Sequence, residues 1–117
     1  MIAILFSLLI SAADPQAAPS TEQELKCEIG PAVKSLGGND WLIYACQDGN
    51  SVVVAAGAPN PATPFFFIVR PDGEGITLYG EGTGEKSATE PAYNDLKDLK
   101  AADLASLYKE AQTAGSK

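Results

Sequence analysis

Hydrophobic residues occur in short runs in the middle of the chain and at helical spacing near its C-terminus. The runs at 41–47, 50–57, 64–70 and 76–81 are rich in β-branched and aromatic residues, which is typical of strands. From 87 to 111 one apolar stripe has a period of about 3.6 residues, while Leu99 lies off it. The residues of the stripe are Tyr93, Leu96, Leu104, Leu107, Tyr108 and Ala111. Strands followed by helix predict an α+β fold. We expect a four-stranded, mainly antiparallel β-meander, with a C-terminal amphipathic helix or helix pair packed on one face.

The clearest local signal is Asp48-Gly49, which separates the first two of these runs. Asp-Gly between apolar runs is typical of a β-hairpin closed by a two-residue type I′ turn. That turn fixes the register of the hairpin. It pairs Cys46 with Ser51, Tyr44 with Val53, and Leu42 with Ala55.

The segment before the first run is less clearly patterned. Thr21 and Glu24 have the spacing of a capping box, which is compatible with a short helix through Ile29 that Gly30-Pro31 ends. Residues 32–36 fit a helical turn or a strand equally well.

Residues 1–18 have the character of a cleaved export signal, an uncharged apolar run followed by small residues. Cleavage is expected after residue 13 or residue 18, which leaves one small domain over 19–117. The run is too short for a hydrocarbon core that needs roughly 20 residues, so we expect no stable membrane span after processing. It also lacks a basic start, and the alternative is an apolar N-terminal strand or helix of a cytoplasmic protein. Export predicts a periplasmic or secreted location.

The composition disfavours several classes of function. The formal net charge is −7, so a cationic surface for nucleic acid or anionic membranes is not expected. Histidine is absent, which removes the commonest general base and the commonest ligand of transition metals. We therefore expect no enzyme, no cofactor and no metal site.

Cys27 and Cys46 are the two cysteines of the chain. In an exported protein an even number of cysteines is most simply explained by a structural disulfide. A redox-active pair is the alternative, but the chain has no Cys-x-x-Cys motif to lower a thiol pKa.

Other candidate chemistry is weak. The glycine-rich segment 80–87 has Glu85 where a phosphate-binding loop needs its second glycine. Ser106 and Lys109 have the spacing of penicillin-interacting enzymes, but the partner motifs of that class are absent. Paired carboxylates for glycoside or calcium chemistry would have to come from acidic residues near the fourth run, which are Asp72, Glu74, Glu81 and Glu85. Turns and solvated surface explain these residues more simply.

The pattern Tyr44-x-Cys46-x-Asp48-Gly49, followed by Val52–Val54, resembles the first hairpin of small periplasmic lysozyme-inhibitor barrels. The likeness covers about ten residues and consists mostly of the chemistry that any hairpin needs. The inhibitory Ser-Gly-x-x-Tyr loop of that family is absent, and a helical C-terminus departs from a closed barrel.

The aromatic residues of the strands form the candidate interaction surface, because the second and third runs are apolar on both faces. Its residues are Phe65, Phe66, Phe67, Tyr44 and Trp41. One explanation is that the segment 25–36, tied down by Cys27, covers the second face. Its covering residues would be Leu25, Ile29, Val33 and Leu36. The other is an exposed patch for a protein partner, a second copy or an apolar, lipid-like ligand.

These observations predict a non-catalytic binding or interaction module of the cell envelope. The alternative is a small periplasmic enzyme inhibitor or a carboxylate-based envelope enzyme. The oligomeric state is left open.

Overall fold

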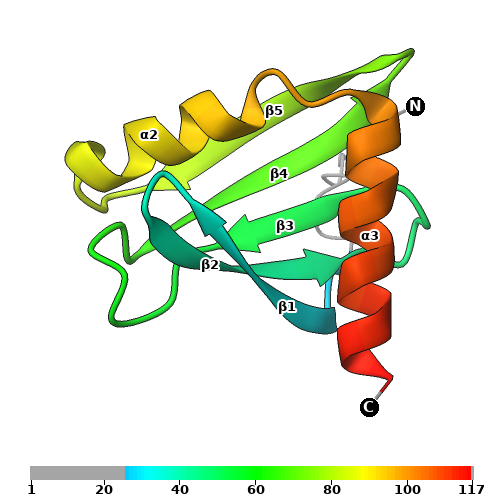
Figure 1. The fold of residues 1–117 in the computed structure, drawn as a ribbon. Helices are drawn as coiled ribbons and strands as arrows, with labels where there is room; N and C mark the ends of the chain where they lie inside the picture. The colour runs from blue at the N-terminus through cyan, green and yellow to red at the C-terminus, as the bar shows by residue number, and fades with distance from the viewer. Residues whose placement is uncertain (1–25, 117) are drawn as a thin grey trace, which may run out of the picture.

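The structure of the protein is a computed structural model, which describes residues 26–116. Five strands form one antiparallel sheet in the order of the sequence, and two helices follow them (Figure 1). The elements are β1 (Ile29–Leu36), β2 (Asn39–Ala45), β3 (Val52–Ala55), β4 (Phe65–Asp72), β5 (Gly75–Gly82), α2 (Lys86–Leu96) and α3 (Ala101–Gly115). The predicted α+β fold class, with an antiparallel meander and C-terminal helices on one face, is confirmed.

The sheet has one strand more than the sequence pattern predicts. Residues 29–36 form β1, an edge strand paired with β2, so the alternative of a helical turn over 32–36 is wrong. Pro31 is compatible with this strand because the register shifts between Ile29 and Ala32, where a proline removes no regular ladder bond. The helix expected over 21–29 falls mostly outside the described residues, and its last residue begins β1. The predicted signal segment also lies outside them.

The hairpin register between β2 and β3 is confirmed, but the turn that closes the hairpin differs. Tyr44 pairs with Val53, and the Cys46 N–H donates to the Ser51 carbonyl at 2.9 Å. A two-residue turn at Asp48-Gly49 would be closed by residues 47 and 50, but the last bonded pair of the hairpin is Cys46 and Ser51. The chain turns directly after Cys46, where the Gly49 N–H donates to the Cys46 carbonyl at 3.2 Å. Gly49 has a φ of 82°, the left-handed conformation that glycine adopts without strain.

The C-terminal region consists of two helices, which settles the alternative between one kinked helix and a pair. Both lie on the same face of the sheet, with α3 crossing the strands (Figure 1). The chain leaves α2 where the Leu99 N–H donates to the Leu96 carbonyl at 3.1 Å. At the start of α3 the Asp103 carboxylate accepts the Lys100 N–H at 2.9 Å, which satisfies a donor at the helix end.

The hydrophobic core lies between the helices and the inner face of the sheet. Trp41 is fully buried, and its Nε1–H donates to the Leu36 carbonyl at 3.1 Å. The helices contribute small and branched side chains to the same cluster. The buried hydrophobic residues of the cluster are Leu36, Trp41, Ile43, Ala45, Val52, Val54, Ala62, Phe67, Val69, Ala88, Ala92, Leu96, Leu104, Leu107 and Ala111.

Candidate interaction surface

The face of the sheet opposite the helices is formed by the alternate residues of each strand. We call it the helix-free face, because neither helix of residues 26–116 lies on it. Because successive strand residues point to opposite faces, the neighbours of the buried core residues must point away from the helices. The apolar side chains of this face are Val33, Leu42, Tyr44, Val53, Ala55, Phe66, Ile68 and Tyr79.

These side chains form two rows across the sheet. One row follows the register from Val33 through Leu42 and Ala55 to Phe66, and it ends at Glu81. The other runs from Tyr44 through Val53 and Ile68 to Tyr79. Directly opposed side chains lie about 5 Å apart, so each row is a continuous apolar strip.

The two ends of the helix-free face are its most exposed parts. Val33 on β1 is 62% exposed and Tyr79 on β5 is 50% exposed, and the side chains between them are half-buried. The Tyr79 hydroxyl donates to the Glu81 carboxylate at 2.9 Å, which places a negative charge beside the aromatic end. The face is therefore apolar along its middle and acidic at this edge.

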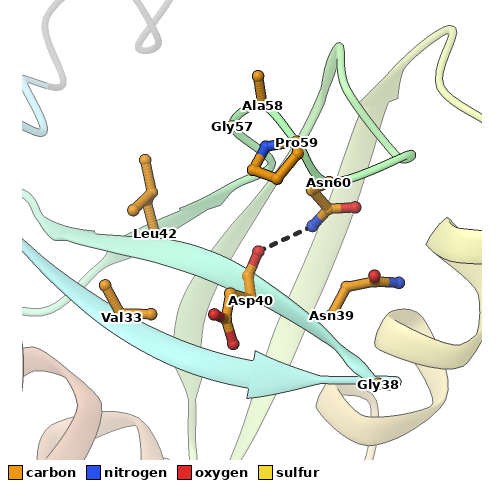
Figure 2. A pocket seen from close by; sticks show the side chains of 9 residues that line it. All are labelled: Val33, Gly38, Asn39, Asp40, Leu42, Gly57, Ala58, Pro59 and Asn60. Atoms are coloured by element: carbon orange, nitrogen blue, oxygen red, sulfur yellow. Dashed lines mark hydrogen bonds between the residues drawn. The ribbon is translucent and has the colours of Figure 1, made fainter.

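At its other edge the face adjoins an open pocket of about 450 Å³ (Figure 2). Val33 and Leu42 contribute its apolar lining, and the Asp40 carboxylate lies at the same end. The connector between β3 and β4 forms the opposite wall. Asn60 fixes this wall, because its Nδ2 donates to the Asp40 carbonyl at 2.9 Å while its Oδ1 accepts the Ala62 N–H at 2.8 Å.

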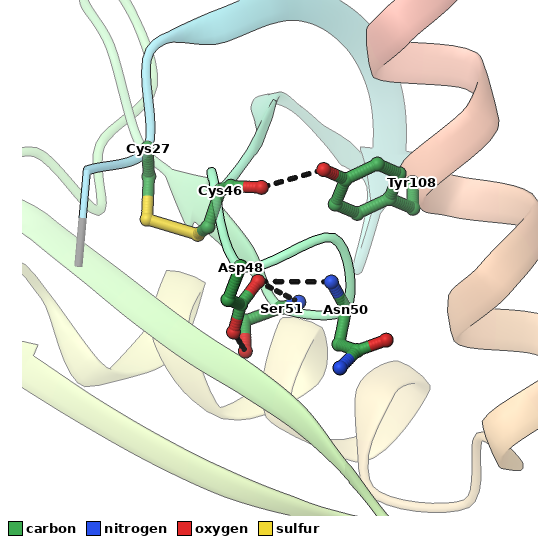
Figure 3. Close-up of a disulfide and its surroundings, with 6 residues drawn as sticks. All are labelled: Cys27, Cys46, Asp48, Asn50, Ser51 and Tyr108. Atoms are coloured by element: carbon green, nitrogen blue, oxygen red, sulfur yellow. Dashed lines mark hydrogen bonds between the residues drawn. A yellow bond between two sulfur atoms is a disulfide. The ribbon is translucent and has the colours of Figure 1, made fainter.

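The disulfide between Cys27 and Cys46 closes another corner of the sheet, with an S–S distance of 2.05 Å (Figure 3). It confirms the predicted pairing. The backbone of Cys46 is also bonded to the helical layer, because the Tyr108 hydroxyl of α3 donates to the Cys46 carbonyl at 2.5 Å. One residue therefore links the N-terminal segment, β2 and α3.

Asp48 stabilises the adjoining turn through its carboxylate. Its Oδ1 accepts the N–H groups of Asn50 and Ser51, each at 2.9 Å, and its Oδ2 accepts the Ser51 hydroxyl at 2.6 Å. Partial burial raises the pKa of Asp48, but these hydrogen bonds and the positive charge of Arg70 outweigh that effect. The net result is a pKa below its ordinary value of 3.8.

The structure divides the predicted aromatic surface between the two faces. Tyr44 and Phe66 lie on the helix-free face. Trp41 and Phe67 are buried in the core instead, with ring centroids 5.5 Å apart. Phe65 is half-buried and packs edge-on against Phe67 at 5.0 Å, so it belongs to the helical side.

The expected cover of the second face is also corrected by the structure. Residues 29–36 pair beside β2 at the edge of the sheet and do not lie across it. Leu36 packs into the core on the helical side, while Val33 adds to the helix-free face. Leu25 lies outside the described residues.

Sequence reasoning missed Val33, Leu42 and Tyr79 as surface residues. Val33 belongs to a strand whose pattern was ambiguous. Leu42 stands in a run that is apolar on both faces, and Tyr79 shares its face of the fourth run with the polar residues Thr77 and Glu81. The faces become distinguishable only when the helices are placed on one of them. The register, which the hairpin turn predicts, then identifies Leu42 as a neighbour of Tyr44 on that surface.

The acidic residues considered for catalysis do not gather in a cleft. Asp72 and Glu74 lie at the tip of the hairpin between β4 and β5, and Glu85 precedes α2. Within residues 26–116 no group of three or more histidine, cysteine or acidic side chains is placed to hold a metal ion.

Among the described residues, neither helix has the length and hydrophobicity needed to cross a membrane. Comparison with known protein families, curated proteins and solved structures finds no match to this chain.

Proposed function

We propose that the protein is a non-catalytic binding module that uses the helix-free face to hold an apolar surface of a partner protein. The observation that carries this proposal is the asymmetry of the sheet. Two helices cover one face, while the other keeps two apolar rows with Val33 and Tyr79 exposed at their ends. Contiguous apolar surface of this kind is typical of interaction sites.

The half-buried side chains in the middle of the face suit this role. Phe66 and Tyr44 are large and rigid, and they lose little conformational freedom when a partner covers them. The backbone of this face is also held in place at one end, because the disulfide and the Tyr108 hydrogen bond both attach to Cys46, directly after β2. A preorganised surface loses less entropy on binding than a surface that must first become ordered.

We further propose that the module acts in the periplasm or outside the cell. The disulfide supports an oxidising compartment, and residues 1–18 have the pattern of an export signal. The negative charge of the chain disfavours nucleic acid and anionic lipid as the partner.

Site-specific photo-crosslinking in the producing cell tests the proposal. A photoreactive phenylalanine analogue replaces Phe66, and in a control protein it replaces Lys109, an exposed residue of α3. We expect one discrete protein adduct from position 66 and none from position 109. Phe66→Ala should weaken the same complex by at least about 30-fold, as expected for a central aromatic anchor. Absence of an adduct at position 66, or the same adduct from both positions, contradicts the proposal.

A further inference from the structure

The two edges of the sheet differ in how well they are protected against further pairing. β1 carries Pro31, a register shift and Lys34, which are devices that discourage another strand from adding to an edge. β5 has none of them. It pairs with β4 in an unbroken register over eight residues, and Glu81 is its only charged residue. A regular edge with a single charged residue is a template for another strand.

The hydrogen bonds show which groups of β5 lie at this edge. The Ala56 N–H donates to the Phe65 carbonyl at 2.9 Å, so Phe65 is bonded toward β3. Because bonding direction alternates along a strand, Phe66 and Ile68 are bonded toward β5. Their partners in β5 are Glu81 and Tyr79, whose backbone groups are therefore bonded toward β4. The residues that alternate with these partners direct their N–H and C=O groups outward, away from β4. The outward residues are Ile76, Leu78, Gly80 and Gly82.

We propose that a second copy of this chain pairs with β5 in antiparallel fashion, about a two-fold axis at Tyr79. This register uses every outward residue. Leu78 pairs with Gly80 of the second copy and Ile76 pairs with its Gly82, and each pair occurs twice by symmetry. An isologous interface of this kind closes after two copies.

The side chains fit this register on both faces. On the helical face each branched residue stands opposite a glycine, so no two bulky side chains oppose each other in the ladder. On the helix-free face Thr77 stands opposite Glu81 of the second copy, and Tyr79 stands opposite itself. No like charges oppose each other in this register, and opposed aromatic side chains stabilise antiparallel pairs.

A pocket beside the edge supports the same occupant. It has a volume of about 330 Å³ and lies between the β4–β5 ribbon and α2, and Gly80, Gly82, Phe65 and Tyr93 contribute to its lining. Leu78 of the second copy, placed opposite Gly80 on the same face, lies next to the aromatic part of this pocket, whose rim also carries Lys86 and Glu90. An edge that no strand of residues 26–116 pairs with, a register without repulsion and an adjoining pocket thus point to one partner. The proposal does not rest on the helix-free face binding another protein.

Charge variants at the two-fold axis test the register. In the purified protein we expect dimers with a dissociation constant on the order of 100 µM, because pairing through one strand buries a small area. Tyr79→Lys and Tyr79→Glu should each raise that constant at least about 10-fold, since each variant opposes like charges at the axis. A mixture of the two should restore dimers, all of them heterodimers by native mass spectrometry. Val33→Lys, on the same face at the other edge, is the control and should leave dimerisation unchanged.

Amide exchange gives a second measurement that needs no variant. The N–H groups of Leu78 and Gly80 should exchange more slowly as the protein concentration rises, while those of Val33 and Ser35 at the β1 edge should not change. A wild-type protein that stays monomeric at about 1 mM overturns the proposal. So does a mixture of the two charge variants that stays monomeric, or exchange at Leu78 that is independent of concentration.

Discussion

Leu104→Ala tests whether α3 completes the core as described. Leu104 is 1% exposed and belongs to the cluster between the helices and the sheet. The substitution removes about three methylene equivalents, worth roughly 2.4 kcal/mol of transfer free energy. A residual cavity on the order of 40 Å³ adds about 1 kcal/mol. The free energy of unfolding should therefore fall by about 3–4 kcal/mol, a large part of the total for a domain of this size.

The molecule supplies its own probe for this measurement. Trp41 is the single tryptophan of the chain and is fully buried, so its fluorescence reports loss of the core in a urea titration. Val33→Ala is the control. Because the Val33 side chain is 62% exposed, this substitution should change the free energy of unfolding by less than about 0.5 kcal/mol. A loss below about 1 kcal/mol for Leu104→Ala, or equal losses for the two variants, would refute the placement of α3.

Three further predictions concern the disulfide corner. Replacing both Cys27 and Cys46 by alanine should destabilise the fold by about 3 kcal/mol, because the bond joins residues separated by 19 positions; finding free thiols in the native protein would contradict the bond itself. Tyr108→Phe should cost about 1 kcal/mol in urea unfolding through the lost hydrogen bond to the Cys46 carbonyl, and no loss would mean that water replaces it. The pKa of Asp48 is lowered in the folded state, so its contribution to stability is present above 3.8 and is lost as the pH falls through the folded pKa. Asp48→Asn should therefore destabilise the protein at neutral pH, and the difference from the wild type should shrink in acid; a difference that does not change with pH would exclude this role.

The turn signal and the helical stripe carried most of the fold prediction. Asp48-Gly49 fixed the pairing of Tyr44 with Val53 even though the turn closes differently, because the register depends on the separation of the paired residues and not on the turn type. Leu104 and Leu107 lie in the core, as expected of residues whose spacing puts them on the apolar stripe of a helix.

The first strand and the division of the aromatic residues could not be predicted. Gly30-Pro31 is typical of a helix stop or a turn, and only an edge position with a register shift makes it compatible with β1. Phe65, Phe66 and Phe67 give no alternation from which a buried face could be chosen. That choice depends on where α2 and α3 pack, which is a property of the tertiary structure.

The order of the elements has a consequence for how the chain acquires its structure as it emerges from a ribosome or a membrane pore. Each strand pairs with the strand before it in the sequence, so the sheet can grow strand by strand from the N-terminal end. The part of its inner face that β1 and β2 form stays largely uncovered until α3 has emerged, because this helix packs chiefly on these two strands, which are made first. Until then Trp41 and its neighbours on the inner face are open to solvent, and so are the apolar rows on the helix-free face. Early termination or proteolytic clipping within α3 would leave a sheet that is apolar on both faces, which is a substrate for chaperones or for aggregation.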